Sequence, residues 1–136
     1  MPDDAEIILV HDAARPLISA RTIDDVIDAA EQFGGATAAV PSKDTIKIVD
    51  AEGFVKQTPP RRDLVSVQTP QGFKREILLQ AYARAEAENF LGTDDSSLVE
   101  RLGAKVKVVT SGYDNIKITT PEDIHVAETL LRGEIK

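Results

Sequence analysis

An apolar strand that stops abruptly at a charged loop limits the possible folds of this chain more than any other feature. Residues 7–10 are Ile-Ile-Leu-Val, a run typical of a strand buried at the centre of a parallel sheet. His-Asp-Ala-Ala-Arg follows, and Pro16 prevents the strand from continuing. In open α/β sheets, ligands bind just beyond the carboxyl ends of the strands. We therefore expect Asp12 and Arg15 where a metal ion and a phosphate would bind; the alternative is a salt bridge between them.

The next segment predicts a strand–helix–strand unit. Ser19 or Thr22 can cap a helix with one apolar face, and Gly34-Gly35 ends it. The residues after these glycines, 36–40, form a second short apolar strand before Pro41. This pattern indicates an α/β fold.

The middle of the chain predicts a β-hairpin with polar residues on both faces. Residues 44–49 and 54–58 are the two strands, and Asp-Ala-Glu-Gly forms the turn. An isolated two-stranded hairpin is marginally stable, so we expect this arm, at about residues 43–62, to lie against something. A second subunit is the preferred partner, and the alternative is the arm's own domain.

The remaining pattern predicts two further strands and three helices. We expect strands at 64–68 and 105–109, and helices at about 73–89, from Thr93-Asp94 to Leu102, and from Thr120 onward. The inward apolar faces are expected to include Phe73, Ile77, Leu78, Ala81, Tyr82 and Ala85 in the first helix and Ile124, Ala127, Leu130 and Leu131 in the last.

The composition excludes several classes of function. The chain has 136 residues and a net charge of −7, which argues against nucleic acid or an anionic membrane as the main partner. It has no cysteine, so disulfides, zinc–thiolate sites and cysteine nucleophiles are excluded. No apolar run approaches the ~20 residues that a membrane span needs. A soluble cytoplasmic protein is the expectation.

Five motifs occur in order along the chain: His11–Pro16, Lys43–Lys47, Gln68–Phe73, Thr93–Glu100 and Asn115–Asp123. Together they resemble the motifs of the 2-C-methyl-D-erythritol 4-phosphate cytidylyltransferases. The resemblance covers nearly the whole chain. It implies a Rossmann-like nucleotidyltransferase fold, with a mostly parallel sheet flanked by helices and a protruding dimerisation arm. It also implies a homodimeric enzyme that transfers CMP from CTP to 2-C-methyl-D-erythritol 4-phosphate, with Mg²⁺ and release of diphosphate, in the non-mevalonate isoprenoid pathway.

The resemblance also implies roles for individual residues. Asp12 takes the metal-binding position, and Lys117 supplies a charge to the substrate phosphates. From its alternation with Ile116 and Ile118 alone, Lys117 could equally be a surface residue. The implied substrate-binding residues are Arg15, Thr45, Arg61, Thr93 and Asp94. Thr45 and Arg61 would act across the dimer, Arg62 leaves the choice of arginine open, and capping of the next helix also explains Thr93 and Asp94.

The chain matches no Gly-rich phosphate loop, although the family it resembles begins with one. We therefore expect residues 1–136 to be the carboxyl-terminal part of a single cytidylyltransferase domain that lacks the amino-terminal segment. Such a chain is predicted to be inactive alone and to leave an open sheet edge at residues 7–10. Two alternatives are transfer to another alditol phosphate, such as ribitol 5-phosphate, and a non-catalytic dimerisation fragment.

Overall fold

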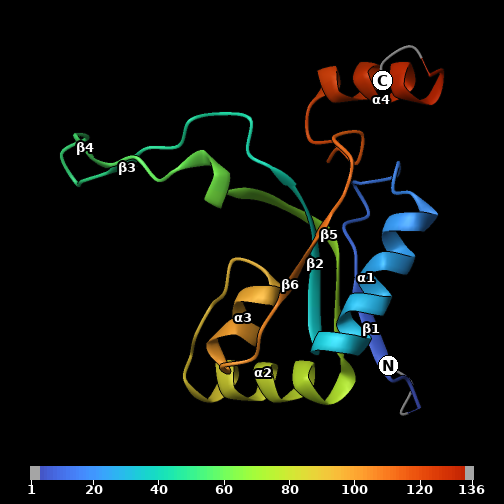
Figure 1. The fold of residues 1–136 in the computed structure, drawn as a ribbon, viewed down its shortest axis with the longest axis vertical. Coiled ribbons are helices and arrows are strands. Elements are labelled where there is room, and N and C mark those ends of the chain that lie inside the picture. The colour runs from blue at the N-terminus through green and yellow to red at the C-terminus, as the bar shows by residue number, and fades with distance from the viewer. Residues whose placement is uncertain (1–3, 134–136) are drawn as a thin grey trace.

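The computed structural model describes residues 4–133 and centres on a four-stranded sheet with the order β1-β5-β2-β6 (Figure 1). The strands are β1 (Ile7–Val10), β2 (Gly35–Pro41), β5 (Val65–Lys74) and β6 (Lys107–Thr110). The helices are α1 (Ala20–Phe33), α2 (Arg75–Ala87), α3 (Asp95–Arg101) and α4 (Pro121–Leu131). The arm holds β3 (Ile48–Val49), β4 (Val55–Gln57) and the 3-10 turn η1 (Arg61–Asp63). The expected α/β fold is confirmed.

The sheet is mixed, which corrects the expectation of a mostly parallel one. β5 pairs antiparallel with both β1 and β2, and only β2 and β6 pair in parallel. The reason is the route of the chain. It leaves β2 at Pro41, passes through the arm and returns opposite Pro41 at Val65. The arm therefore acts as the long loop of an antiparallel β2–β5 hairpin, and no crossover helix intervenes.

β1 lies at the edge of the sheet, not at its centre. Within residues 4–133 it pairs only with β5, and its four residues are half-buried instead of fully buried. The open edge expected at this strand is therefore present. Its carboxyl end still delivers the loop that begins with His11.

β5 is longer than predicted and continues through a cis Thr69-Pro70 bond to Lys74. Phe73 therefore belongs to the strand, where it pairs with Ile8 and is fully buried, and the helix begins later, at Arg75. Gly72 allows α1 to approach the strand, since a Cβ atom there would lie 2.8 Å from Leu9 Cδ2 and 3.0 Å from Val26 Cγ1.

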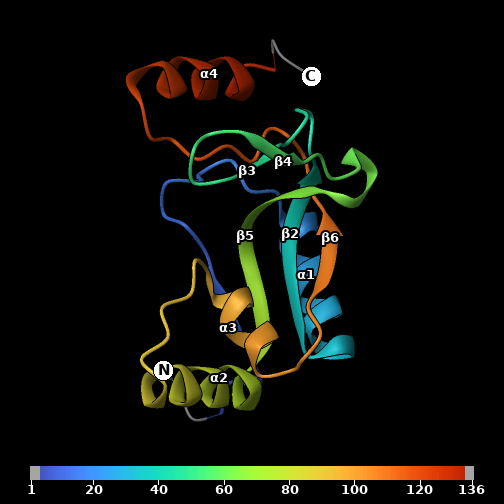
Figure 2. The same cartoon turned by 90° about the vertical axis from the view of Figure 1, so that its left-hand side faces the viewer.

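Two apolar clusters hold α1 on one face of the sheet and α2 and α3 on the other (Figure 2). On one face, Val26 and Ala30 of α1 pack against Ala36 and Ala38 of β2. The cluster on the other face joins the sheet to α2 and α3 and consists of Phe73, Leu78, Ala81 and Val99.

The arm and α4 extend away from these clusters (Figure 1). Phe54 at the arm tip is 67% exposed. In α4 only Ala127 is buried, while Ile124 and Leu131 are 50% and 73% exposed, so their expected inward positions are wrong. Tyr82 of α2 is likewise exposed. None of the described helices is long and apolar enough to cross a membrane.

Candidate functional site

The loop after β1 forms a closed turn that presents a carboxylate and a guanidinium together. The Arg15 N–H donates to the Asp12 carbonyl at 3.0 Å. The side chains also meet, because Arg15 Nε donates to Asp12 Oδ2 at 3.2 Å. Arg15 Nη1 donates to the carbonyl of Asn115 at 2.7 Å. The alternative salt bridge is therefore present, and it fixes the position of both groups.

Lys117 joins this pair from the segment that follows β6. Its Nζ lies 3.8 Å from Asp12 Oδ2, and its side chain is about half exposed. The neighbouring Ile118 N–H donates to the Ala14 carbonyl at 2.8 Å and holds this segment against the turn. Two cations thus flank one carboxylate, which leaves local positive charge that can bind a phosphate.

A cavity of about 310 Å³ opens beside these three residues. It brings together five of the seven predicted site residues from three parts of the chain. The lining residues are Asp12, Arg15, Val67, Gln68, Thr69, Gln71, Thr93, Asp94 and Lys117.

Thr45 and Arg61 do not reach this cavity within the chain. Both are exposed residues of the arm. Arg61 Nη1 donates to the Lys43 carbonyl at 2.9 Å and lines a separate hollow at the base of the arm. Arg62 lines the same hollow and lies 4.0 Å from Asp63.

Asp94 caps α3, as the capping alternative predicted. Its Oδ1 accepts from the Ser97 N–H at 2.8 Å, while Oδ2 accepts from Ser96 Oγ at 2.9 Å and Gln71 Nε2 at 3.0 Å. Burial alone would raise the pKa of Asp94, but these hydrogen bonds outweigh it and the pKa is lowered. Asp94 is therefore an ionised cap that fixes Thr93 at the cavity.

Tyr82 of α2 ties the start of α3 to the rest of the domain. Its hydroxyl donates to the carboxylate of Asp95, the residue after the cap. Partial burial of the hydroxyl of this otherwise exposed residue, together with the contact to Asp95, raises the pKa of Tyr82 to about 12. This contact supports the position of the Thr93–Asp94 segment.

Two buried amide side chains, Gln68 and Gln71, line the cavity, and a third, Asn115, hydrogen-bonds to Gln68. The sequence analysis assigned these three residues no role. Gln68, Gln71 and Asn115 are 8%, 2% and 2% exposed. Asn115 Nδ2 donates to Gln68 Oε1 at 3.0 Å and to the Thr69 carbonyl at 2.8 Å. Gln71 links β5 to α3 by accepting from the Ser96 N–H at 3.0 Å. The signal available for Gln68 and Gln71 was the presence of two amides within one strand, whereas Asn115 lies in the segment after β6.

The carboxylates present fit a magnesium ion that arrives together with phosphates. The described residues contain no cluster of three or more His, Cys, Asp or Glu side chains suited to a metal. Both oxygens of Asp94 are already hydrogen-bonded. Asp12 Oδ2 pairs with Arg15 and Lys117, so Oδ1 of Asp12 is the carboxylate oxygen at this cavity that a cation could use. Mg²⁺ commonly binds one or two carboxylates plus substrate phosphates.

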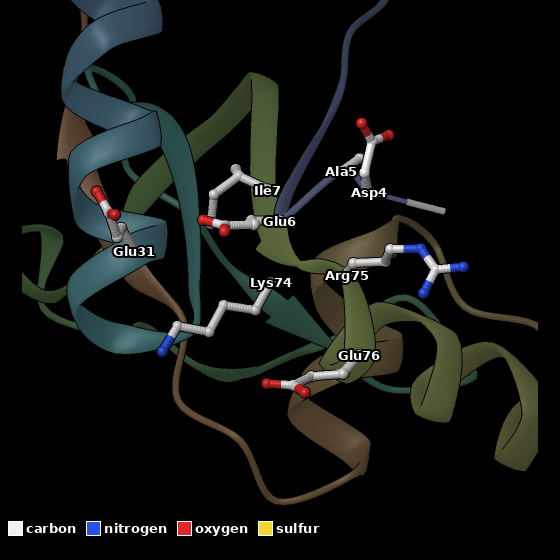
Figure 3. Close-up of a pocket in the computed structure, with 8 residues that line it drawn as sticks. All are labelled: Asp4, Ala5, Glu6, Ile7, Glu31, Lys74, Arg75 and Glu76. Carbon is white, nitrogen blue, oxygen red and sulfur yellow. The ribbon is translucent and has the colours of Figure 1, made fainter. Parts of the chain in front are cut away.

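A second hollow, of about 440 Å³, lies near the amino-terminal end of β1 (Figure 3). Lys74 and Arg75 point in different directions there, and Glu6, Glu31 and Glu76 line the same hollow (Figure 3). The residues that line this hollow include none of the seven predicted site residues.

Comparison with known proteins identifies the family of this chain. Residues 1–133 match the family of 2-C-methyl-D-erythritol 4-phosphate cytidylyltransferase (IspD). The chain is 53% identical over 129 residues to the protein of that name from Caldanaerobacter subterraneus subsp. tengcongensis, with 95% of this chain and 57% of the relative covered. It is 51% identical over 133 residues to that of Bacillus thuringiensis, covering 98% and 58%.

Solved structures match the fold as well. The 4-diphosphocytidyl-2C-methyl-D-erythritol synthase of Anaerococcus prevotii superposes with a TM-score of 0.91 at 39% identity, covering 97% of this chain and 59% of that one. The 2-C-methyl-D-erythritol 4-phosphate cytidylyltransferase of Thermus thermophilus gives 0.82 at 37% identity, covering 94% and 63%. The chain therefore spans somewhat more than half the length of these relatives, and it belongs to the 2-C-methyl-D-erythritol 4-phosphate cytidylyltransferase family.

Proposed function

We propose that this chain carries the cation- and acceptor-binding part of an enzyme that transfers CMP from CTP to 2-C-methyl-D-erythritol 4-phosphate. The reaction releases diphosphate and belongs to the non-mevalonate isoprenoid pathway. Support comes from membership of the family and from the charged groups around one cavity. Because CTP and a sugar-alcohol phosphate are charged metabolites, the proposed location is the cytoplasm.

The observation that carries the proposal is the convergence of Asp12, Arg15 and Lys117 on that cavity. The carboxylate and the cations come from two segments far apart in the sequence. If Lys117 were only a surface lysine and Asp12–Arg15 only a loop ion pair, nothing would require them to line one cavity together with further polar groups.

In the proposed reaction, a phosphate oxygen of the acceptor attacks the α-phosphorus of CTP. A new P–O bond forms, the bond from the α-phosphorus to the oxygen bridging to the β-phosphate breaks, and diphosphate leaves with that oxygen. The chemistry requires positioning and charge stabilisation more than covalent help from the protein. Arg15 and Lys117 would donate to phosphate oxygens, and Asp12 would hold Mg²⁺. When bound, Mg²⁺ neutralises charge on the triphosphate.

The proposed enzyme is a homodimer joined through the arm. Ile48, Val49, Phe54 and Val55 are 42–67% exposed on the arm, which suits burial against a second copy. Thr45 and Arg61 lie outside the cavity of their own chain, so we assign them to the acceptor phosphate in the partner's cavity.

Product formation tests the proposal directly. The chain is assayed for release of diphosphate from CTP, alone and with the unmatched part of a relative's chain supplied in trans. Each state is tested with methylerythritol phosphate and with ribitol 5-phosphate. We expect activity with methylerythritol phosphate in the complemented state. A folded complex that uses only ribitol 5-phosphate, or neither acceptor, would contradict the proposal.

A further inference from the structure

His11 touches both ends of the turn that carries Asp12 and Arg15. Its Nε2 lies 2.9 Å from the carbonyl of Arg15, and its Nδ1 lies 3.0 Å from the hydroxyl of Thr69 on β5. The same hydroxyl accepts from the Asp12 N–H at 2.9 Å. The His11 ring is therefore hydrogen-bonded to the Arg15 backbone directly and is linked to the Asp12 backbone through the Thr69 hydroxyl.

The partner of Nε2 determines that this ring nitrogen carries a hydrogen. The Arg15 carbonyl can only accept, so Nε2 must hold a hydrogen. The Thr69 hydroxyl receives the Asp12 N–H and retains its own proton, which it can donate to Nδ1. A ring with hydrogen on Nε2 therefore satisfies all three contacts.

We propose that His11, through its Nε2–H bond to the Arg15 carbonyl and its Nδ1 contact with Thr69, is a positioning residue that fixes the turn from Asp12 to Arg15 for binding of phosphate and its magnesium ion. The hydrogen bonds alone support the geometry of this inference, whereas its effect on ligand binding rests on the proposed function. Without the ring, the Arg15 carbonyl and the Thr69 hydroxyl lose their shared link, and the guanidinium gains freedom relative to the carboxylate. Groups that orient metal ligands in this way typically affect affinity about 10–100-fold.

Nitrogen-15 NMR tests the geometry without any ligand. The chain has only two histidines, and His125 on exposed α4 is the internal reference. In alkaline buffer, where the spectra report the neutral ring, we expect His11 to show the Nε2–H pattern. The Arg15 Nε–H signal should exchange slowly in the wild type and rapidly in His11→Phe. An Nδ1–H pattern, or an Arg15 signal unchanged by His11→Phe, would overturn the proposal.

Conservative variants separate positioning from general damage. A glutamine amide can replace Nε2 and an asparagine amide can replace Nδ1. We therefore expect His11→Gln to restore slow exchange at Arg15 Nε–H, and His11→Asn to restore slow exchange at the Asp12 N–H. His125→Gln is the matched control, with both signals unchanged. If neither His11→Gln nor His11→Asn restores slow exchange, although both variants have wild-type circular dichroism, the proposal would also be overturned.

Binding of diphosphate with Mg²⁺ then tests the consequence. We expect His11→Phe to weaken binding about tenfold and His11→Gln to recover part of the loss. Wild-type binding by His11→Phe would overturn the positioning role. In contrast, equal binding by the wild type and Arg15→Gln would overturn the proposed function while the NMR result on His11 still stands.

Discussion

Lys117 Nζ lies 3.8 Å from Asp12 Oδ2, although the two residues come from opposite ends of the chain. The carboxylate is also paired with Arg15 at 3.2 Å. One negative charge thus organises two positive ones at the mouth of a polar cavity. A phosphate group would complete the balance of charge, and this relationship underlies the predictions below.

Removing the charge of Lys117 should weaken anion binding without affecting the fold. In Lys117→Met, we expect affinity for diphosphate with Mg²⁺ to fall about tenfold or more, since hydrogen bonds to charged groups contribute about 1.5–3 kcal/mol. Titration calorimetry measures the change. Lys105→Met removes an exposed lysine elsewhere and should bind normally. Equal affinities for the two variants would contradict the role of Lys117.

Truncation of Asp94 should destabilise the domain through α3. We expect Asp94→Ala to lose about 1 kcal/mol of unfolding free energy, because the cap of the helix is removed. Urea unfolding checks this, with Asp28→Ala on the exposed side of α1 as control. A loss no larger than that of the control would contradict the capping role.

The charge of Asp94 should also give a specific dependence of stability on pH. Its folded pKa is lowered below the ordinary value of 3.8, so as the pH falls the unfolded chain takes up the proton first. The stabilisation is present above pH 3.8 and disappears as the pH falls through the lower folded pKa. Asp94→Asn keeps a capping side chain without the charge, so its stability deficit should shrink over that acidic range. A deficit that grows on acidification would be the opposite result.

An acidic residue at the arm tip should separate the proposed dimer. Phe54 is 67% exposed within the chain, so Phe54→Asp should leave the domain folded. Light scattering after gel filtration should change from a dimer to a single 14.8 kDa chain. Leu91→Asp, at a residue 94% exposed outside the arm, is the control and should remain dimeric. A Phe54→Asp protein that is still dimeric would contradict assembly through the arm.

Mixing two inactive variants should reveal whether the arm completes the partner's site. Asp12→Asn damages the cavity and Arg61→Ala damages the arm. If the two groups act in one shared site across the dimer, mixed dimers contain one intact site and activity returns. We expect recovery on mixing, measured as diphosphate release in the complemented assay. Activity that stays at the level of the separate variants would place Arg61 outside the partner's site.

Local sequence pattern predicted the features that depend on neighbouring residues. The strand that ends at Val10, the glycine end of α1 and the projecting hairpin all follow from nearby residues. The Thr120 cap of α4 is also present, as a capping box with Asp123 and Pro121 at the helix start.

Features decided by distant partners were not predictable in the same way. Phe73 continues a strand because Ile8 pairs with it and the core encloses it, while its spacing alone suited a helix. The antiparallel insertion of β5 depends on the route through the arm. Ile124 is apolar yet exposed. The buried amides of Gln68 and Asn115 form a hydrogen bond between segments far apart in the sequence, and no local sequence periodicity predicts such a contact.

The central claim is that the Asp12 carboxylate holds the cation that accompanies the nucleotide phosphates, and one substitution tests it most directly. Asp12→Asn preserves the size of the side chain and removes its charge. In the complemented CMP-transfer assay, we expect the rate to fall at least about a hundredfold, with thermal unfolding unchanged. A folded Asp12→Asn protein that transfers CMP at the wild-type rate would contradict the account.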